Sequence, residues 1–170
     1  MQATITTIAE VGYGRASYAQ IAKRAGLWST GLISYHFASK AELIDQVVAE
    51  VVAAGQRFML PRIEASAPGR DRLRAYVTSN LEFMAAHRAH MRAVVEILNA
   101  LPREAGGQAA PYAPRHARGL AQLEGYLREG QRNGQLCRFS VGAMAVAVFF
   151  VSHGFDGRAD AQRSRVSARF

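Results

Sequence analysis

Residues 17–43 read SYAQIAKRAGLWSTGLISYHFASKAEL, and this stretch decides the fold of the N-terminal part of the chain. It predicts a short helix, a turn at Gly26, a second short helix rich in small polar groups, and the start of a further helix at Ser39. Two short helices joined by a glycine-containing turn are typical of a helix-turn-helix, which places its second helix in the DNA major groove.

Capping residues set the limits of these helices. Ser17 is followed three residues later by Gln20, and Ser39 by Glu42, so each pair fits the capping-box pattern. The first helix of the pair is expected to stop at Gly26, and Ser29 or Thr30 to open the next one, which runs to about residue 35. Ile33 and Phe37 are expected to be its buried side.

The rest of the chain also has helical spacing of apolar residues, which predicts an all-α fold. Further helices are expected over about 2–11, 70–86, 90–101 and 115–132, and from Ser140 onward. Pro61 and the segment 65–69 are expected to break the long helix that starts at Ser39. Residues 102–114 read as a loop, and no pattern remains after Gly157.

Composition limits the class of protein. The 170 residues are 49% hydrophobic with a single cysteine, Cys137, so a globular chain without an internal disulfide is expected. We expect no signal peptide, and the apolar run 141–151 is too short to span a bilayer, so a cytoplasmic protein with no membrane partner is the expectation. The net charge is +8, but residues 1–46 hold four basic and three acidic residues, which argues against non-specific coating of DNA.

No catalytic pattern is present in the sequence. It has no glycine-rich phosphate loop after a strand, no nucleophile elbow and no paired carboxylates in an expected cleft, so we predict no enzyme activity, no catalytic residues and no cofactor. His87 and His90 have a spacing that could hold a metal ion, but without a third ligand nearby we interpret them as solvated histidines and predict no metal site.

The run AQIAKRAGLWSTGLISYHFASKAELI resembles the N-terminal domain of the TetR family of bacterial repressors over residues 1–52. That family combines an IA-x-x-AG turn, a serine-led recognition helix ending in a Tyr/His-Phe cluster, and an SK-x-x-L helix start. The matching residues here are Ile21, Ala22, Ala25, Gly26, Ser29, His36, Phe37, Ser39, Lys40 and Leu43. Downstream, the chain resembles the family in its helical layout.

The resemblance implies a DNA-binding site and the role of each residue in it. Phosphate contacts are expected from Ser17, Tyr18 and Lys40, base contacts from Thr30 and Gly31, and groove or backbone contacts from Ser29, Ser34, Tyr35 and His36. A recognition helix of hydroxyls without Arg or Asn implies few direct hydrogen bonds to bases and more dependence on DNA shape.

The resemblance also implies a ligand-responsive repressor that binds a palindromic operator as a homodimer and is released by a small-molecule effector. Candidate effector-binding residues are Tyr76, Asn80, Phe83, Met84, His87, Met91, Glu96 and Tyr112, although Met and aromatic residues at helical spacing are usually core. Candidate dimer-interface residues are Leu120, Leu123, Leu127, Val146, Phe149 and Phe150. The expected division is a helix-turn-helix domain over 1–46, a regulatory and dimerisation domain over 47–157, and a basic tail over 158–170.

Three features depart from the family pattern. Two apolar residues, Leu27 and Trp28, stand where the family usually has one, and we expect Trp28 to pack in the core, with exposure against the sugar-phosphate backbone as the alternative. Met1 falls inside the first helix, and the arginine-rich tail has no amphipathic face. These departures leave an alternative function open, a relative of the family that folds but has lost dimerisation or DNA binding.

Overall fold

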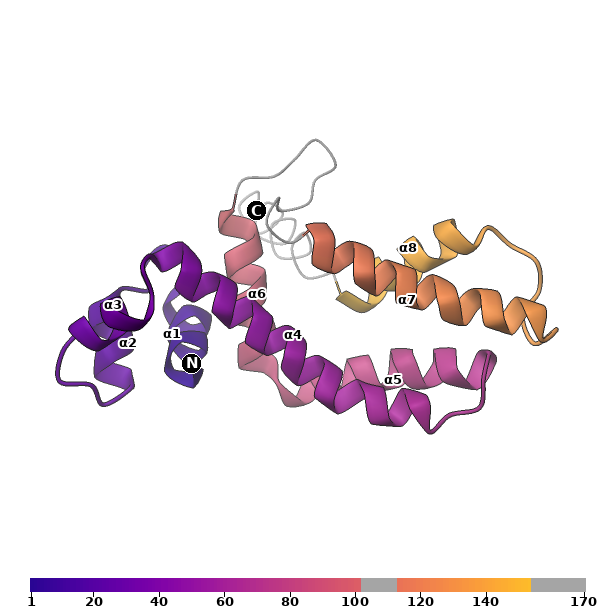
Figure 1. Cartoon of the computed structure of the whole chain (residues 1–170), viewed down its shortest axis with the longest axis horizontal. Helices are drawn as coiled ribbons and strands as arrows, with labels where there is room; N and C mark the ends of the chain where they lie inside the picture. The colour runs from indigo at the N-terminus through magenta and orange to yellow at the C-terminus, as the bar shows by residue number, and fades with distance from the viewer. Residues whose placement is uncertain (102–112, 154–170) are drawn as a thin grey trace, which may run out of the picture. The chain divides into compact units, whose positions relative to one another are not determined.

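The computed structural model describes residues 1–101 and 113–153 of the chain, and those residues form eight helices and no strand, which confirms the all-α fold (Figure 1). The helices are α1 (Gln2–Val11), α2 (Tyr18–Arg24), α3 (Gly31–His36), α4 (Lys40–Glu64), α5 (Arg70–Ala86), α6 (Arg88–Ala100), α7 (Ala113–Arg132) and α8 (Val141–His153). The predicted tail and most of the predicted 102–114 loop lie outside the described residues.

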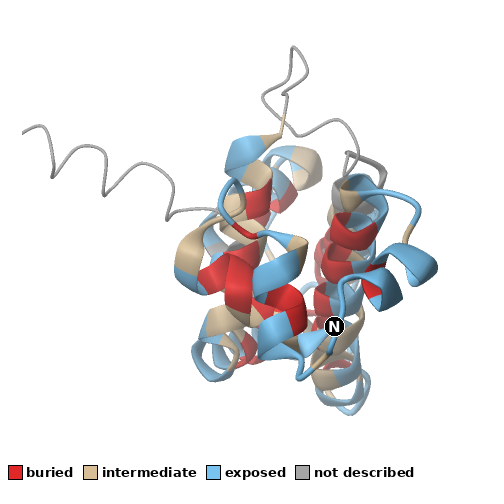
Figure 2. Ribbon diagram, turned by 90° about the vertical axis from the view of Figure 1, so that its left-hand side faces the viewer, coloured by how far each residue is buried: buried red, intermediate tan, exposed pale blue. Residues whose placement is uncertain are grey.

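The chain divides into two compact units, each with its own buried residues (Figure 2). Unit one comprises residues 1–57 and 84–101, and unit two comprises residues 58–83 and those from 102 onward. The helices α4 and α5 therefore each contribute residues to both units. The domain limits expected from the sequence, at residues 46 and 157, stay a prediction.

Unit one is organised around α1, which packs against α2 and α6. The side chains of Ile5 and Ile8 are almost completely buried, and Thr7 is buried beside them with its hydroxyl donating to the carbonyl of Ala3 at 2.7 Å. On the α6 side, Ile97 is fully buried. Burial of this apolar face holds a ten-residue helix that would be marginal in isolation.

The capping box expected at Ser17 forms, and the one expected at Ser39 forms in part, because the Glu42 carboxylate binds the amide of Ala38 in place of that of Ser39. The amide of Gln20 donates to the Ser17 hydroxyl at 3.3 Å, and the Ser17 amide donates to the Gln20 side chain at 3.2 Å. At α4, the Glu42 amide donates to the Ser39 hydroxyl at 3.1 Å, while the Glu42 carboxylate accepts from the amide of Ala38 at 2.7 Å. Each pair satisfies two amides that the helix itself cannot pair.

Pro61 does not break α4, and the prediction that it would is wrong. The helix continues through Pro61 to Glu64. A proline inside a helix removes one backbone hydrogen bond and costs about 3 kcal/mol. The ring of Pro61 lies on the exposed side of α4, while two residues later Ile63 is buried in the core of unit two. The free energy gained by burying Ile63 offsets the cost of the proline. The spacing of apolar residues in the sequence did not indicate that Ile63 would be buried.

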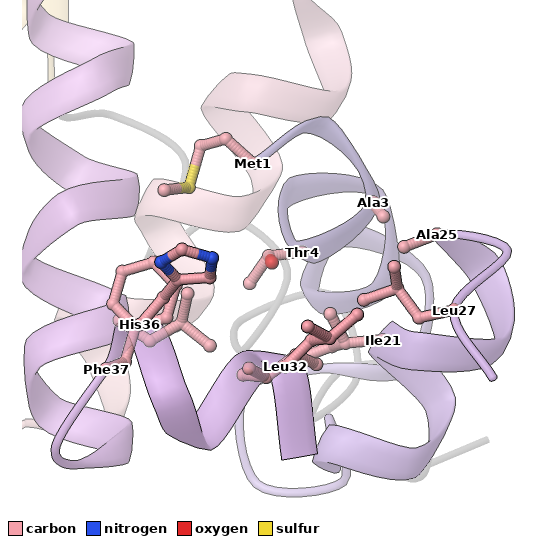
Figure 3. Close-up of a pocket in the computed structure, with 11 residues that line it drawn as sticks. Met1, Ala3, Thr4, Ile21, Ala25, Leu27, Leu32, His36 and Phe37 are labelled. Atoms are coloured by element: carbon pink, nitrogen blue, oxygen red, sulfur yellow. The ribbon is translucent and has the colours of Figure 1, made fainter. Parts of the chain in front are cut away.

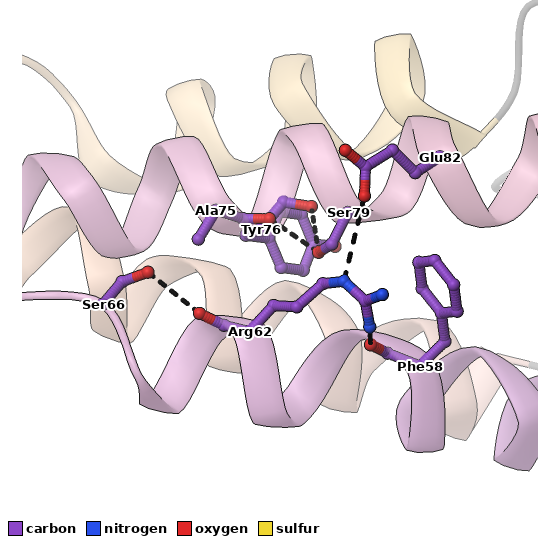
Figure 4. A network of polar contacts seen from close by, with 7 residues as sticks. All are labelled: Phe58, Arg62, Ser66, Ala75, Tyr76, Ser79 and Glu82. Carbon is purple, nitrogen blue, oxygen red and sulfur yellow. Dashed lines mark hydrogen bonds and ion pairs between the residues drawn. The ribbon is translucent and has the colours of Figure 1, made fainter.

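The core of unit two is formed by Ile63, Tyr76, Leu123, Leu127, Ala145 and Phe149. Polar contacts surround this core within α4 and within α5, and one ion pair joins the two helices (Figure 4). The guanidinium of Arg62 donates to the Phe58 carbonyl at 2.5 Å, lies 3.9 Å from the centre of the Phe58 ring, and approaches the Glu82 carboxylate at 3.9 Å. The hydroxyl of Ser79 donates to the Ala75 carbonyl at 2.6 Å.

Candidate nucleic-acid interface

The short helix α3 is anchored by one side and leaves the rest of its surface exposed. Of its six residues only Ile33 is buried, and it joins Ile21, Ala22 and Leu43 in a small apolar cluster. Tyr18, Leu27 and Phe37 pack around that cluster and are partly buried. The arrangement confirms Ile33 as the packed side of α3, and it presents the opposite side to solvent.

The exposed surface of α3 and of the two residues before it carries small polar groups, two rings and the side chain of Leu32, which is 51% exposed. Exposed residues are Ser29, Thr30, Gly31, Ser34, Tyr35 and His36. The start of the helix is held by the Ser29 hydroxyl, which accepts from the Gly31 amide at 3.0 Å, while Thr30 occupies the N-cap position without a side-chain bond. Tyr35 and His36 stand edge to face with their ring centres 5.3 Å apart. Small hydroxyls and a glycine allow a helix to approach the floor of a major groove closely.

The three residues expected to contact phosphate differ in their exposure and in the contacts that they already make within the chain. Ser17 is exposed, but its hydroxyl already accepts the capping bond, and Tyr18 is partly buried against the apolar cluster. The Lys40 ammonium donates to the Tyr13 carbonyl at 3.1 Å and lies 4.7 Å from the centre of the Tyr13 ring. An ammonium group has three donors, so Lys40 can bind a phosphate while it keeps its bond to Tyr13. Such a phosphate would lie beside the turn between α1 and α2, which contains Tyr13.

Trp28 is fully exposed, at 104% of its reference area, so the expectation that it packs in the core is wrong. The place in the apolar cluster is taken by Leu27, whose amide donates to the Ala22 carbonyl at 2.9 Å. Trp28 lies at a bend of the chain between α2 and α3. Leu27 packs against the cluster while Trp28 is exposed to solvent, so the extra residue in the turn enlarges the exposed surface.

An apolar pocket of about 210 Å³ lies on the inner side of α3 (Figure 3). Met1 and Thr4 line it from the α1 side, and Leu32, His36 and Phe37 from the α3 side. His36 is thus exposed and also borders this pocket, between the expected DNA side and the core. The lining is almost wholly apolar and supplies no set of donors for a phosphate or cofactor.

The candidate effector-binding residues divide between the two units. In unit two, Tyr76, Asn80 and Phe83 are buried along α5, and burial, followed by the neighbouring Tyr126, raises the pKa of Tyr76 to about 12. In unit one lie Met84, His87, Met91 and Glu96, all partly buried. Tyr112 lies outside the described residues.

Two of these candidates have structural surroundings of their own. The Glu96 carboxylate occupies the space next to Gly12 into which a Cβ at that position would point. His87 stands edge to face with His90 at 5.3 Å; burial and then His87 lower the pKa of His90, while Glu50 opposes this shift. Within the described ranges no three His, Cys, Asp or Glu side chains gather to hold a metal ion.

The second pocket, of about 270 Å³ in unit two, is lined by Val77, Leu81, Ala147, Val148 and Val151. Neither this pocket nor the one beside α3 is lined by any candidate effector-binding residue. Residues 1–101 and 113–153 also contain no helix long and apolar enough to cross a membrane.

The candidate dimer-interface residues do not form one surface. Leu123, Leu127 and Phe149 are buried in the core of their own unit, and Leu120 packs against that core. These side chains pack within one subunit, and the assignment of the six residues to a dimer interface stays a prediction. Val146 is 42% exposed and remains available, and the side chain of Phe150 lies outside the described residues.

The helical spacing of the sequence did not indicate two exposed apolar side chains at the interface. Leu32 is 51% exposed on α3, and Trp28 precedes that helix. The only sequence signal for Trp28 was the additional apolar residue in the turn, which is equally consistent with a buried or an exposed side chain.

Residues 1–47 match the family described as bacterial regulatory proteins, tetR family. The chain is also similar to the HTH-type transcriptional regulator BetI of Escherichia coli O17:K52:H18, with 36% identity over 95 residues. That similarity covers 55% of this chain and 48% of the relative, so the chain matches about half the length of such relatives.

Solved structures of the same architecture extend over more of the chain. The regulator FadR from Bacillus subtilis, in complex with stearoyl-CoA, superposes with a TM-score of 0.72 at 22% identity, covering 89% of this chain and 80% of that one. The TetR family regulator PfmR from Thermus thermophilus gives a TM-score of 0.70 at 19% identity, covering 88% and 78%. At these identities the likeness concerns the fold.

Proposed function

We propose that this chain, whose residues 1–47 match the tetR family of bacterial regulatory proteins, is a transcriptional regulator of that family that reads DNA with α3. The observation that carries the proposal is the surface of α3. One residue, Ile33, anchors the helix, while Thr30, Gly31, Ser34 and Tyr35 remain exposed. A helix held by one side and bare on the other is what insertion into a groove requires.

Direct contacts to bases would be few and small. The exposed side of α3 offers hydroxyls from Thr30, Ser34 and Tyr35, and no Arg or Asn that could form the bidentate pairs worth about 1–3 kcal/mol each. Recognition would therefore combine hydroxyl and methyl contacts with the sequence-dependent shape of the duplex. Lys40, Ser17 and Tyr18 would position the unit on phosphates, which carry no sequence information themselves.

The regulator acts, in this proposal, as a homodimeric repressor on a palindromic operator. Two recognition helices would then lie about one helical turn of DNA apart, roughly 34–36 Å. Val146 and Val151 are exposed apolar residues of α8. A second copy of the chain packed on α8 would remove this apolar surface from water, which supports a dimer contact at this helix. Leu120 is the remaining α7 candidate at such an interface.

Release from DNA would be driven by a small-molecule effector. The buried polar groups of α5, Tyr76 and Asn80, together with Phe83, are the candidate contacts in unit two. The FadR structure holds stearoyl-CoA, so an acyl-CoA thioester is the first effector class to test. An effector shifts the DNA-binding equilibrium only by its differential affinity for the two states, typically about 1–3 kcal/mol.

Selection of bound duplexes from a random pool at fixed near-physiological salt tests DNA reading first. An enriched palindrome supports the proposal, and the spacing of its half-sites reports the geometry of the dimer. Ser34→Ala should weaken binding to the selected duplex, with Thr78→Ala, at an exposed position of α5, as the matched control. If folded protein enriches no sequence, the chain is instead a relative of the family that no longer reads DNA.

Acyl-CoA thioesters can then be titrated into the complex of protein and selected duplex. Dissociation of the complex would support the effector part of the proposal, and Asn80→Ala should raise the concentration needed. A complex that stays intact at every chain length tested would remove acyl-CoA thioesters from consideration while leaving the DNA-reading result in place.

A further inference from the structure

Trp28 presents the largest uncovered apolar surface among the described residues of unit one. Its side chain is fully exposed, although burial of a tryptophan removes some 150–250 Å² of largely apolar surface from water. Two more large apolar side chains are exposed close by in the sequence, Leu32 at 51% and Tyr35 at 85%. A single exposed apolar residue needs no explanation, but a fully exposed tryptophan next to a short helix with two further exposed apolar side chains is a candidate contact surface, although Leu32 also lines the pocket beside α3.

The backbone that carries Trp28 is fixed on both sides. The amide of Leu27 donates to the Ala22 carbonyl at 2.9 Å, and the Ser29 hydroxyl accepts from the Gly31 amide at 3.0 Å. The indole is therefore displayed from a segment whose direction is set by α2 and α3. A side chain held out in this way loses little backbone freedom when a partner binds.

The charge and the residue types around Trp28 fit a nucleic acid. Residues 11–41 contain four basic side chains and no acidic one, although Arg24 pairs with Glu10 just outside this range. This leaves Arg15, Lys23 and Lys40 as the cations closest in sequence to Trp28 that form no ion pair with an acidic side chain of the described residues. Exposed hydroxyls from Ser29, Thr30 and Ser34 alternate with the apolar groups, in contrast to a continuous apolar face suited to a protein partner. An apolar side chain in such a setting can pack on deoxyribose carbons and on the thymine methyl group, which is the apolar feature of the major groove.

We propose that Trp28 is a DNA-contacting residue whose indole lies against the deoxyribose and thymine methyl carbons at the edge of the bases read by α3, an inference that rests on the proposed function. A duplex that contacts Ser29, Thr30 and Gly31 must approach an uncovered side chain immediately before them. The additional residue in the α2–α3 turn thereby becomes a specificity determinant.

Tryptophan fluorescence can report on this contact directly, because Trp28 is the only tryptophan in the sequence. The probe is a fluorescein-labelled duplex obtained by the random-pool selection, with binding followed by anisotropy and tryptophan emission followed without the label. Binding of the duplex is expected to quench the emission and to protect the indole from acrylamide. An emission shift that instead follows protein concentration, without DNA, would place Trp28 between protein copies and overturn the inference.

Substitution supplies the energetic test. Trp28→Ala is expected to weaken binding about tenfold, which corresponds to about 1.4 kcal/mol, and Trp28→Phe to recover most of the loss. Val52→Ala, another exposed apolar position, is the control and should bind as the natural protein does. Because the indole makes no core contact, the thermal midpoint by circular dichroism should be unchanged in Trp28→Ala.

Replacing thymidine by deoxyuridine in the duplex removes only the methyl groups. At the contacted position this change should weaken the natural protein and leave Trp28→Ala unaffected, as expected for one shared contact. If the duplex binds but emission, acrylamide access and the affinity of Trp28→Ala all stay within twofold of their reference values, the inference about Trp28 is wrong and DNA reading stands. If no duplex binds the folded natural protein, the proposed function and the inference about Trp28 are both wrong.

Discussion

Replacement of Gly12 by alanine should destabilise unit one strongly, because two separate penalties meet at this residue. Gly12 follows α1 with φ of 83° and ψ of 158°, a backbone region that is essentially restricted to glycine. Forcing a residue with a Cβ into it costs about 1–3 kcal/mol. A Cβ on Gly12 would also lie 3.1 Å from a carboxylate oxygen of Glu96, so that α6 side chain would have to move.

The turn cannot escape this strain without losing other bonds. The Gly12 amide donates to the Ile8 carbonyl at 2.9 Å, and the Gly12 carbonyl accepts from the Ala16 amide at 3.1 Å. These two hydrogen bonds set the path of the chain from the end of α1 to Ser17, the N-cap of α2. The position of α2 in turn affects that of α3, because both helices contribute to the same apolar cluster. We expect Gly12→Ala to cost about 2–3 kcal/mol in all, at the upper end of the backbone penalty.

Urea denaturation followed by far-ultraviolet circular dichroism measures this cost. With a slope of about 2 kcal/mol per molar urea, the midpoint should fall by about 1 M or slightly more. Tryptophan fluorescence is a poor reporter of unfolding here, because Trp28 is already exposed in the folded state.

Gly14→Ala is the matched control, since Gly14 lies two residues away with no positive φ and with nothing near the position of its Cβ. That change should be neutral or stabilise by up to about 1 kcal/mol through the unfolded chain. Adding Glu96→Ala to Gly12→Ala should relieve only the smaller, steric part. Equal effects of Gly12→Ala and Gly14→Ala, within about 0.5 kcal/mol, would refute the reasoning.

Three further predictions concern local caps, the core and pH. Ser17→Ala removes the capping bonds at α2 and should cost about 1 kcal/mol in a urea titration, whereas Ser66→Ala, outside a capping box, should cost less. Leu127→Ala opens the core of unit two and should cost about 2–5 kcal/mol, against less than about 1 kcal/mol for Leu81→Ala at an exposed position; similar losses would contradict the burial of Leu127. The raised pKa of Tyr76, about 12 against an ordinary value of 10, means that its stabilising effect is complete below pH 10 and is lost as pH rises from 10 through 12. Stability curves should therefore fall less steeply over that range for Tyr76→Phe than for the natural protein, and curves that coincide would show that Tyr76 does not contribute.

The N-terminal elements were predictable because their signals are local. The capping pairs Ser17–Gln20 and Ser39–Glu42 act over three or four residues, and the glycine turn at Gly26 is set by a single backbone conformation with φ of 70°. Such interactions depend little on the rest of the chain. The helical periods and the buried side of α3 followed from the same short-range information.

The outcome at the candidate site depended on distant segments. Lys40 lies against Tyr13, 27 residues earlier in the chain, so how much of its ammonium remains for phosphate could not be inferred from the α4 sequence. The candidate effector-binding residues were chosen by helical spacing, yet they divide between two units. Spacing specifies which residues share a helix face, while the element facing them is set by the fold.

The sequence by itself determined the all-α class, the limits of most helices and the helix-turn-helix arrangement, because caps, glycine turns and apolar periods act within a few residues. Only the tertiary structure decided the environment of individual side chains. Leu27 packs against the apolar cluster, and Trp28 is exposed to solvent. Ile63 is buried two residues after Pro61, within a helix that continues past the proline. Leu123 and Leu127 pack in the core of their own unit. Burial is a property of the segments that meet in space, and no local pattern contains that information.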